Sequence, residues 1–159
     1  MIPWMKTLLI VYHTGGVKTA TMAEAVERGA RTGGEDAAGV NVVVKRCADA
    51  GPEDLLAADG LILGTPENFG YMSGMMKDFL ERVYYACEGK VNGRPYALFV
   101  GAGQDGGGAV ASVERIVTGL RLEKKAEPVI GLKDLTPEVV GRCEELGAAF
   151  AAGLALGVF

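Results

Sequence analysis

The sequence predicts an α/β fold: one three-layer, doubly wound domain with a five-stranded parallel sheet in the strand order 2-1-3-4-5. Three observations predict it. Short apolar runs alternate along the chain with longer segments of helical periodicity. The apolar runs are continuous, as expected for strands that helices cover on both faces. Glycine-rich segments follow the first, third and fourth runs, at the sheet edge where ligands bind in such folds.

Five short runs have the composition of buried strands, and turn residues bound each of them. The expected strands cover residues 7–12, 40–45, 59–65, 96–100 and 126–130. Helical periodicity fills most of the intervening segments. The expected helices begin near residues 18, 52, 73, 110 and 137. Ser73 and Thr136 are suitable amino-terminal caps, and Pro137 suits the first position of a helix.

The composition favours a single domain, residues 1–159, and disfavours a nucleic-acid partner. With 159 residues, of which 49% are hydrophobic, the chain is long enough to bury one continuous core. Its net charge of −4 and its pI of about 5.1 leave no excess of positive charge to hold a phosphate backbone. We therefore expect no nucleic acid among its partners.

Cysteine usage and hydropathy favour a cytoplasmic protein that does not enter a membrane. Cys47, Cys87 and Cys143 are odd in number and lack metal-ligand spacing, so we expect no metal site and small core residues in a reducing compartment. The apolar run at residues 7–12 is too short for a secretory signal. The apolar tail, residues 146–159, falls short of the roughly 20 residues of a membrane-spanning helix. We expect it to pack on the sheet or on another subunit.

Three segments at the carboxyl ends of expected strands have the composition of ligand-binding loops. Residues 13–19 offer hydroxyls, an ammonium and the amides of a helix start, which suit a phosphate, although the Walker spacing is absent. In residues 66–70, Pro66 fixes the backbone and Gly70 permits unusual dihedrals, so this loop suits the edge of a flat ring. Residues 101–108 are too glycine-rich for a helix but expose amides to a ligand. Each segment can also be an ordinary capped or flexible turn.

The second of these segments carries a resemblance to a known family. Residues 64–80 read Gly-Thr-Pro-Glu-Asn-Phe-Gly-Tyr-Met-Ser-Gly-Met-Met-Lys-Asp-Phe-Leu. They resemble the signature Gly-Thr-Pro-x-x-Phe-Gly-x-Met-Ser-Gly-x-Met-Lys-x-Phe-Leu of flavodoxin-like FMN oxidoreductases, which include NAD(P)H:quinone reductases of the tryptophan-repressor-binding-protein type. Residues 9–14 and 22–26 are similar to the first strand, phosphate loop and first helix of that family. The resemblance covers nearly the whole chain and implies a flavodoxin-like fold.

Residue by residue, the resemblance implies an FMN site and a neighbouring substrate site. The positions that would hold the phosphate, line the isoalloxazine and close its other side are Thr14, Gly15, Gly16, Val17, Lys18, Thr19, Pro66, Glu67, Asn68, Phe69, Gly70, Gly101, Ala102, Gly103, Gln104, Asp105 and Gly106. Tyr12 matches a family position beside the nicotinamide and quinone site. Val17 stands where the family usually has glycine, so Gly15 and Gly16 would have to shape the phosphate turn.

The resemblance implies an FMN-dependent oxidoreductase that passes electrons from NAD(P)H to a quinone or a similar small acceptor. The flavin would supply the chemistry, so no side chain is required as a nucleophile or base. His13 is a candidate for proton delivery because of its pKa range. The alternative is a flavodoxin-type electron carrier that docks on a redox partner, and a third hypothesis is a flavin-free scaffold, which Val17 would favour.

Several properties stay open at the level of sequence. They are the acceptor, the choice between NADH and NADPH, and the subunit count. We expect a homodimer or a larger homo-oligomer, because the apolar tail and the helix with Tyr84 and Tyr85 would expose apolar surface. Negative charge from Glu67 or Asp105 beside the ring would disfavour the anionic reduced flavin.

Overall fold

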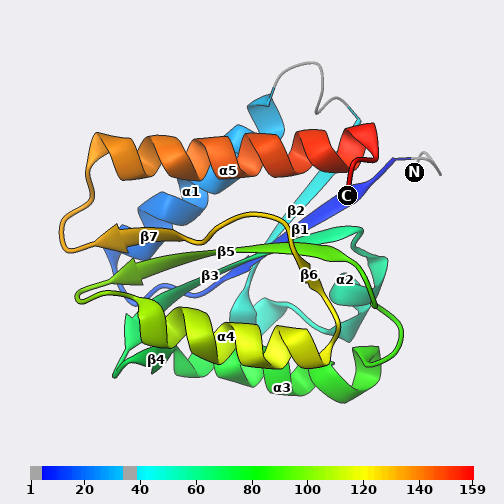
Figure 1. Cartoon of the computed structure of the whole chain (residues 1–159), viewed down its shortest axis with the longest axis horizontal. Helices are drawn as coiled ribbons and strands as arrows, with labels where there is room; N and C mark the ends of the chain where they lie inside the picture. Colours follow the sequence, from blue (N-terminus) through cyan, green and yellow to red (C-terminus); the bar gives the residue numbers. More distant parts are fainter. Residues whose placement is uncertain (1–4, 34–38) are drawn as a thin grey trace.

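The computed structural model describes residues 5–33 and 39–159, which form a parallel sheet between two layers of helices (Figure 1). Two long helices cover each face of the sheet, and a short one contacts α3. On one face lie α1 (Val17–Thr32) and α5 (Pro137–Leu156), and on the other lie α2 (Pro52–Ala57), α3 (Gly74–Cys87) and α4 (Gly107–Gly119). Each face therefore has its own layer of apolar side chains.

The sheet has the strand order expected of a doubly wound fold. Its strands are β1 (Thr7–Tyr12), β2 (Asn41–Arg46), β3 (Gly60–Asn68), β4 (Tyr71–Met72), β5 (Pro95–Ala102), β6 (Glu123–Lys124) and β7 (Val129–Leu132). The main path is β2-β1-β3-β5-β6, and β7 also pairs with β5. Every one of these pairs is parallel. The predicted order 2-1-3-4-5 is confirmed, with β6 and β7 together in the fifth position.

The prediction of five strands is wrong, and one cause is that the last position is divided. The single strand expected at residues 126–130 is instead two short strands, β6 and β7, which pair with different parts of β5. Pro128 lies directly before β7 and has no backbone N–H to donate to a ladder. The ladder therefore breaks between the two pieces.

The other cause is a β-hairpin at the carboxyl end of β3. This strand continues to Asn68 and pairs antiparallel with β4 through Glu67 and Met72. Phe69 and Gly70 form the two-residue turn, with φ of 55° and 67°. Two successive positive φ angles are typical of the tightest hairpin turns. The segment 66–70, predicted to be a loop, is thus a strand end and a turn.

The apolar residues that recur at helical spacing contribute to the cores on the two faces of the sheet. Met22, Ala23, Val26 and Ala30 on α1 are all buried. The three cysteines are free and buried. Among residues 5–33 and 39–159, the structure contains no helix with the length and hydropathy needed to cross a membrane.

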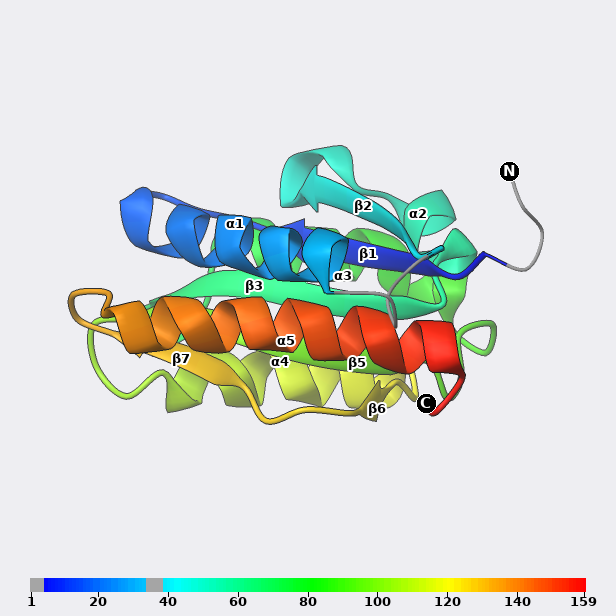
Figure 2. The same cartoon turned by 90° about the horizontal axis from the view of Figure 1, so that it is seen from above.

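Two glycines let α1 and α5 touch along their backbones, side by side above the sheet (Figure 2). A Cβ atom on Gly29 would lie 2.0 Å from the carbonyl oxygen of Glu144. A Cβ atom on Gly147 would lie 2.0 Å from the carbonyl oxygen of Val26. Any larger residue at either position would force the helices apart. The position of α1 therefore depends on α5.

The apolar tail packs mainly within its own chain. Leu146, Phe150 and Leu154 are buried against the sheet together with residues of α1. The ring of Phe159 lies 5.0 Å from that of Phe150, centre to centre. Leu156 and Val158 remain exposed. The expectation that the tail packs on the sheet is confirmed for its buried part.

Candidate cofactor site

The carboxyl ends of β1, β3 and β5 are neighbours in the sheet, and the segments after them surround a cavity of about 350 Å³. The lining residues come from all three of the predicted ligand-binding segments. They are Gly15, Gly16, Val17, Lys18, Thr19, Pro66, Asn68, Gly101, Ala102 and Gly103. Every one of them is among the predicted cofactor positions, so the fold brings those distant segments together.

A second cavity of about 320 Å³ adjoins the first, because Gly103 lines both. Its other lining residues are Glu67, Phe69, Gly70 and Gln104. The hairpin of β3 and β4 forms one wall. Phe69 at the hairpin tip is fully exposed and has a positive φ, which is unusual for a bulky residue. Strained backbone of this kind is concentrated at functional sites.

The start of α1 faces the first cavity with its amides open. The N-cap is Gly16, and its first turn has no acidic residue. Among the described residues, no carboxylate accepts a hydrogen bond from the amides of this helix start, unlike at α4. The hydroxyl of Thr14 stays within its own turn, where it accepts a hydrogen bond from the Gly16 amide at 3.2 Å and donates to the Gly16 carbonyl. Apart from the adjoining residues of the chain, no described atom lies within 4 Å of the Cβ positions of Gly15 and Gly16. Open amides at the positive end of a helix dipole bind phosphate.

Lys18 and Thr19 join α1 to the end of β5 at the floor of this cavity. The Lys18 ammonium donates a hydrogen bond to the Ala102 carbonyl at 2.7 Å. Thr19 is buried, and a Cβ atom on Gly101 would lie 2.5 Å from its hydroxyl oxygen. The glycine thus allows the third segment to approach α1 closely.

The start of α4 is built differently, because two carboxylates already occupy its amides. Glu67 accepts hydrogen bonds from the amides of Gly106 at 3.3 Å and Ala109 at 3.4 Å. Asp105 accepts one from the Gly107 amide at 2.8 Å. These anions take the place that a ligand phosphate would need.

The prediction that residues 101–108 are too flexible for a helix is wrong at its end, since α4 begins at Gly107. The two carboxylates supply the missing stability by capping the first turn. Packing also requires a glycine at position 108, because a Cβ atom there would lie 1.9 Å from the carbonyl oxygen of Gly70.

Tyr12 and His13 lie at the end of β1 but line neither cavity. The guanidinium of Arg46 lies over the Tyr12 ring, 5.2 Å from its centre, and donates to the Thr14 carbonyl at 3.2 Å. Burial and the charge of Arg46 lower the pKa of His13 below its usual 6.5, so the imidazole is neutral at physiological pH. Arg46 is not among the predicted site residues because no motif marks it. Its pairing opposite Tyr12 between β2 and β1 is the feature that places it there.

The comparisons with known proteins agree with this geometry. A family model described as NADPH-dependent FMN reductase matches residues 48–123. A flavodoxin of Aquifex aeolicus is 36% identical over 72% of this chain and 60% of its own length. A protein of Acidithiobacillus ferrooxidans named NAD(P)H dehydrogenase (quinone) is 32% identical over 65% of this chain and 60% of its own length. In sequence, the chain is similar to flavodoxin-like FMN proteins. It spans 60% of the length of these two curated relatives.

A solved flavodoxin structure from the domain Archaea has the same fold as this chain. Its TM-score is 0.79 at 20% sequence identity, and the match covers 93% of this chain and 98% of the archaeal chain. The predicted flavodoxin-like fold is thereby confirmed.

The residues present fit FMN, the cofactor that this family implies. The start of α1 offers uncapped amides and free space for a phosphate, with no carboxylate in its first turn. The adjoining cavity beside the hairpin offers the second compartment that a ring would need. Val17, the departure from the family pattern, is 81% exposed. This side chain therefore leaves the helix start open.

Proposed function

We propose that the chain is an FMN-dependent NAD(P)H oxidoreductase that passes electrons through FMN to a quinone or a similar small acceptor. The observation that carries the proposal is the meeting of the three predicted segments at two adjoining cavities, one rich in open amides and one walled by the hairpin. The family description and the quinone dehydrogenase relative support the enzymatic reading.

The roles proposed for the side chains are binding and orientation. FMN, when bound, supplies the hydride and electron transfer. The start of α1, with Thr19 and Lys18 at its floor, would hold the phosphate. The hairpin would hold the ring against Gly103 and Gln104, which line the same cavity. His13, neutral near pH 7, could accept a proton at the edge of the site.

An anaerobic titration tests this function. The purified protein is loaded with FMN and titrated with NADH and with NADPH while the flavin absorbance is followed, and a quinone is then added. We expect the nicotinamide to bleach the flavin and the quinone to restore its colour. A protein that fails to quench the fluorescence of added FMN at micromolar concentration would overturn the cofactor assignment.

A flavodoxin-type electron carrier is the second candidate. The relative from Aquifex aeolicus bears the name flavodoxin, and the exposed Phe69 leaves the hairpin end of the site accessible to a protein partner. The same titration separates the two functions. Reduction by dithionite or by a protein partner, with none by NADH or NADPH, would favour the carrier.

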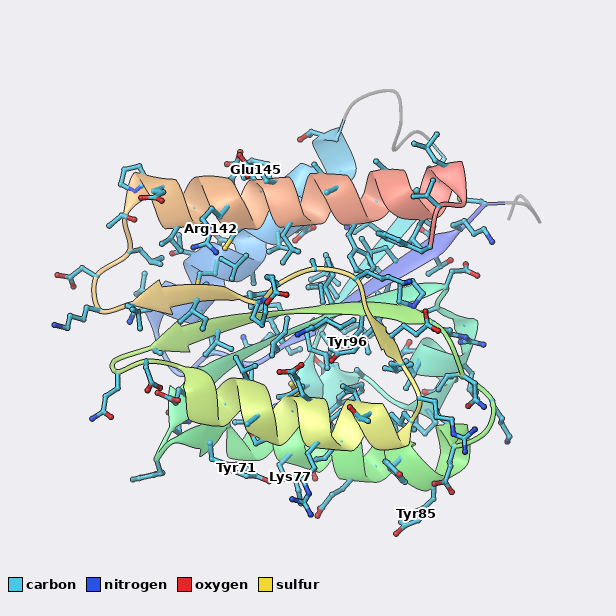
Figure 3. The ribbon with its side chains drawn as sticks, in the orientation of Figure 1. Tyr71, Lys77, Tyr85, Tyr96, Arg142 and Glu145 are labelled. Atoms are coloured by element: carbon cyan, nitrogen blue, oxygen red, sulfur yellow. The ribbon has the colours of Figure 1, made fainter. Side chains whose placement is uncertain are left out.

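We also propose a cytoplasmic homo-oligomer, in the first place a homodimer. The buried, free cysteines support a reducing location. On the side of α3 and α4, where Figure 3 shows Tyr71, Lys77 and Tyr85, a groove of about 380 Å³ contains apolar surface. Tyr85 is 85% exposed beside it. Sedimentation velocity on the native chain and on Tyr85→Lys tests this proposal, and two equally monomeric chains would contradict it.

A further inference from the structure

Glu67 joins the hairpin to α4 with both of its carboxylate oxygens. Oε1 accepts the hydrogen bond from Gly106, and Oε2 accepts the one from Ala109. Gly106 is the N-cap of α4 and has no side chain of its own for this task. Glu67 therefore caps a helix that begins about forty residues later, and it is part of β3.

Two further contacts fasten the hairpin to the same helix. The turn lies against the helix backbone, because a Cβ atom on Gly108 would come within 1.9 Å of the Gly70 carbonyl oxygen. On β4, the Met72 amide donates a hydrogen bond to the Ser112 hydroxyl at 3.0 Å, and that hydroxyl donates to the Ala109 carbonyl at 2.9 Å. Both strands and the turn of the hairpin thus contact α4.

The two acidic residues near the ring cavity differ in where their charge lies. Glu67 is half-buried and lines the cavity, and neither of its oxygens is free to turn away while it caps α4. Asp105 is exposed, bonds only the amide of Gly107 in its own turn, and does not line the cavity. The sequence left open whether Glu67 or Asp105 places a negative charge beside the ring. The structure favours Glu67, because it lines the cavity and Asp105 does not.

We propose that Glu67 is a positioning residue that holds the hairpin wall of the ring cavity on α4 and keeps a fixed negative charge beside the flavin. The inference rests on the proposed binding of FMN. Its first consequence is structural, since loss of the carboxylate should loosen the wall. Its second is electrical, since a fixed negative charge disfavours the anionic form that flavin takes when it is reduced.

The electrical consequence is tested by dye-equilibrated redox titration of the FMN-loaded native chain, Glu67→Gln and the matched control Asp105→Asn. Glutamine keeps one acceptor oxygen but removes the charge. At a given dye potential, Glu67→Gln should raise the ratio of reduced to oxidised flavin about tenfold, which is about 30 mV for a two-electron couple. Asp105→Asn should change the ratio much less. An unchanged ratio in Glu67→Gln, or equal changes in both variants, would overturn the charge assignment.

The structural consequence is tested without flavin, by hydrogen exchange on the full chain. In Glu67→Ala, the amides of Ala109 and Met72 should exchange about tenfold faster than in the native chain, because the cap and the hairpin attachment are both weakened. Asp105→Asn should leave the Met72 amide unchanged. Native-like exchange in Glu67→Ala would overturn the positioning role. A native chain that bound no FMN would refute the proposed function, and this measurement would still decide the role of Glu67.

Discussion

Two helices begin at the cofactor site, and their starts are built in opposite ways. At α1, the N-cap is a glycine, the first turn has no acidic residue and the neighbouring space is open. At α4, the N-cap is also a glycine, but Glu67 and Asp105 occupy the amides of the first turn. Both helix ends have the same positive dipole. Only the start of α1 can offer it to a ligand.

This difference makes the site electrostatically asymmetric between the start of α1 and the start of α4. An anionic group is attracted to the start of α1, while the carboxylates at α4 repel it. For an elongated ligand with a phosphate at one end and a ring at the other, we propose that the phosphate binds at α1 and the ring beside the hairpin. Residues 13–19 and 101–108 are both glycine-rich, so their composition does not distinguish the two ends of the site. The difference lies in which backbone amides already have a hydrogen-bond partner.

The largest expected effect comes from making α1 resemble α4. Val17→Asp introduces a carboxylate in the first turn at an exposed position. Two unit charges about 5 Å apart interact by roughly 3 kcal/mol at an effective dielectric constant of about 20. We expect FMN to bind about 100-fold more weakly, as measured by fluorescence quenching. The carboxylate should also stabilise the helix itself by about 0.3–1 kcal/mol.

Val17→Asn is the matched control, because it has the same shape without the charge. Its FMN affinity should stay close to that of the native chain. Equal losses in the aspartate and asparagine variants would show that shape, and not charge, governs this end of the site.

The next effect comes from separating the hairpin from α4. Gly108→Ala places a methyl group where the Gly70 carbonyl oxygen now lies. Overpacking of this kind costs about 1–3 kcal/mol, to be measured as a lower free energy of unfolding in urea. The control is Gly141→Ala in α5, where no described atom outside the adjacent helix backbone lies within 4 Å of the Cβ position. There alanine should stabilise the helix by about 0.5–1 kcal/mol. A free energy of unfolding for Gly108→Ala that is as high as that of Gly141→Ala would refute the close contact.

The smallest expected effect is the pH dependence of stability that His13 causes near the start of α1. The pKa of His13 is lowered in the folded chain, so just below pH 6.5 the unfolded chain binds more protons than the folded chain. Stability should therefore rise with pH between the folded pKa and 6.5, and fall as the pH is lowered through that window. In His13→Gln, the free energy of unfolding in urea should depend less on pH over the same range. Identical pH profiles would mean that His13 titrates normally.

The sequence predicts the elements whose signals are local. The run at residues 7–12 is β1, and the caps expected at Ser73 and Thr136 accept hydrogen bonds from Met76 and Val139. Apolar runs and cap residues act within a few residues of chain, so a pattern can reveal them.

The hairpin and the roles of two charged residues could not be predicted. Pro66 and Gly70 have the composition of a loop, and β4 is only two residues long, so nothing local marks the return strand. Arg46 comes to Tyr12 through pairing of β2 with β1, and Glu67 comes to α4 through folding of the whole sheet. Such contacts depend on tertiary placement, which a motif does not record.

The glycine contact between α1 and α5 has a consequence for the order of events during synthesis. The orientation of the open amides at the start of α1 depends on the position of α1, which packs on α5 through Gly29 and Gly147. While residues 137–156 are still inside the ribosome, α1 lacks this support and a large part of its covering layer. A nascent chain should therefore capture its cofactor late, after α5 has emerged and docked.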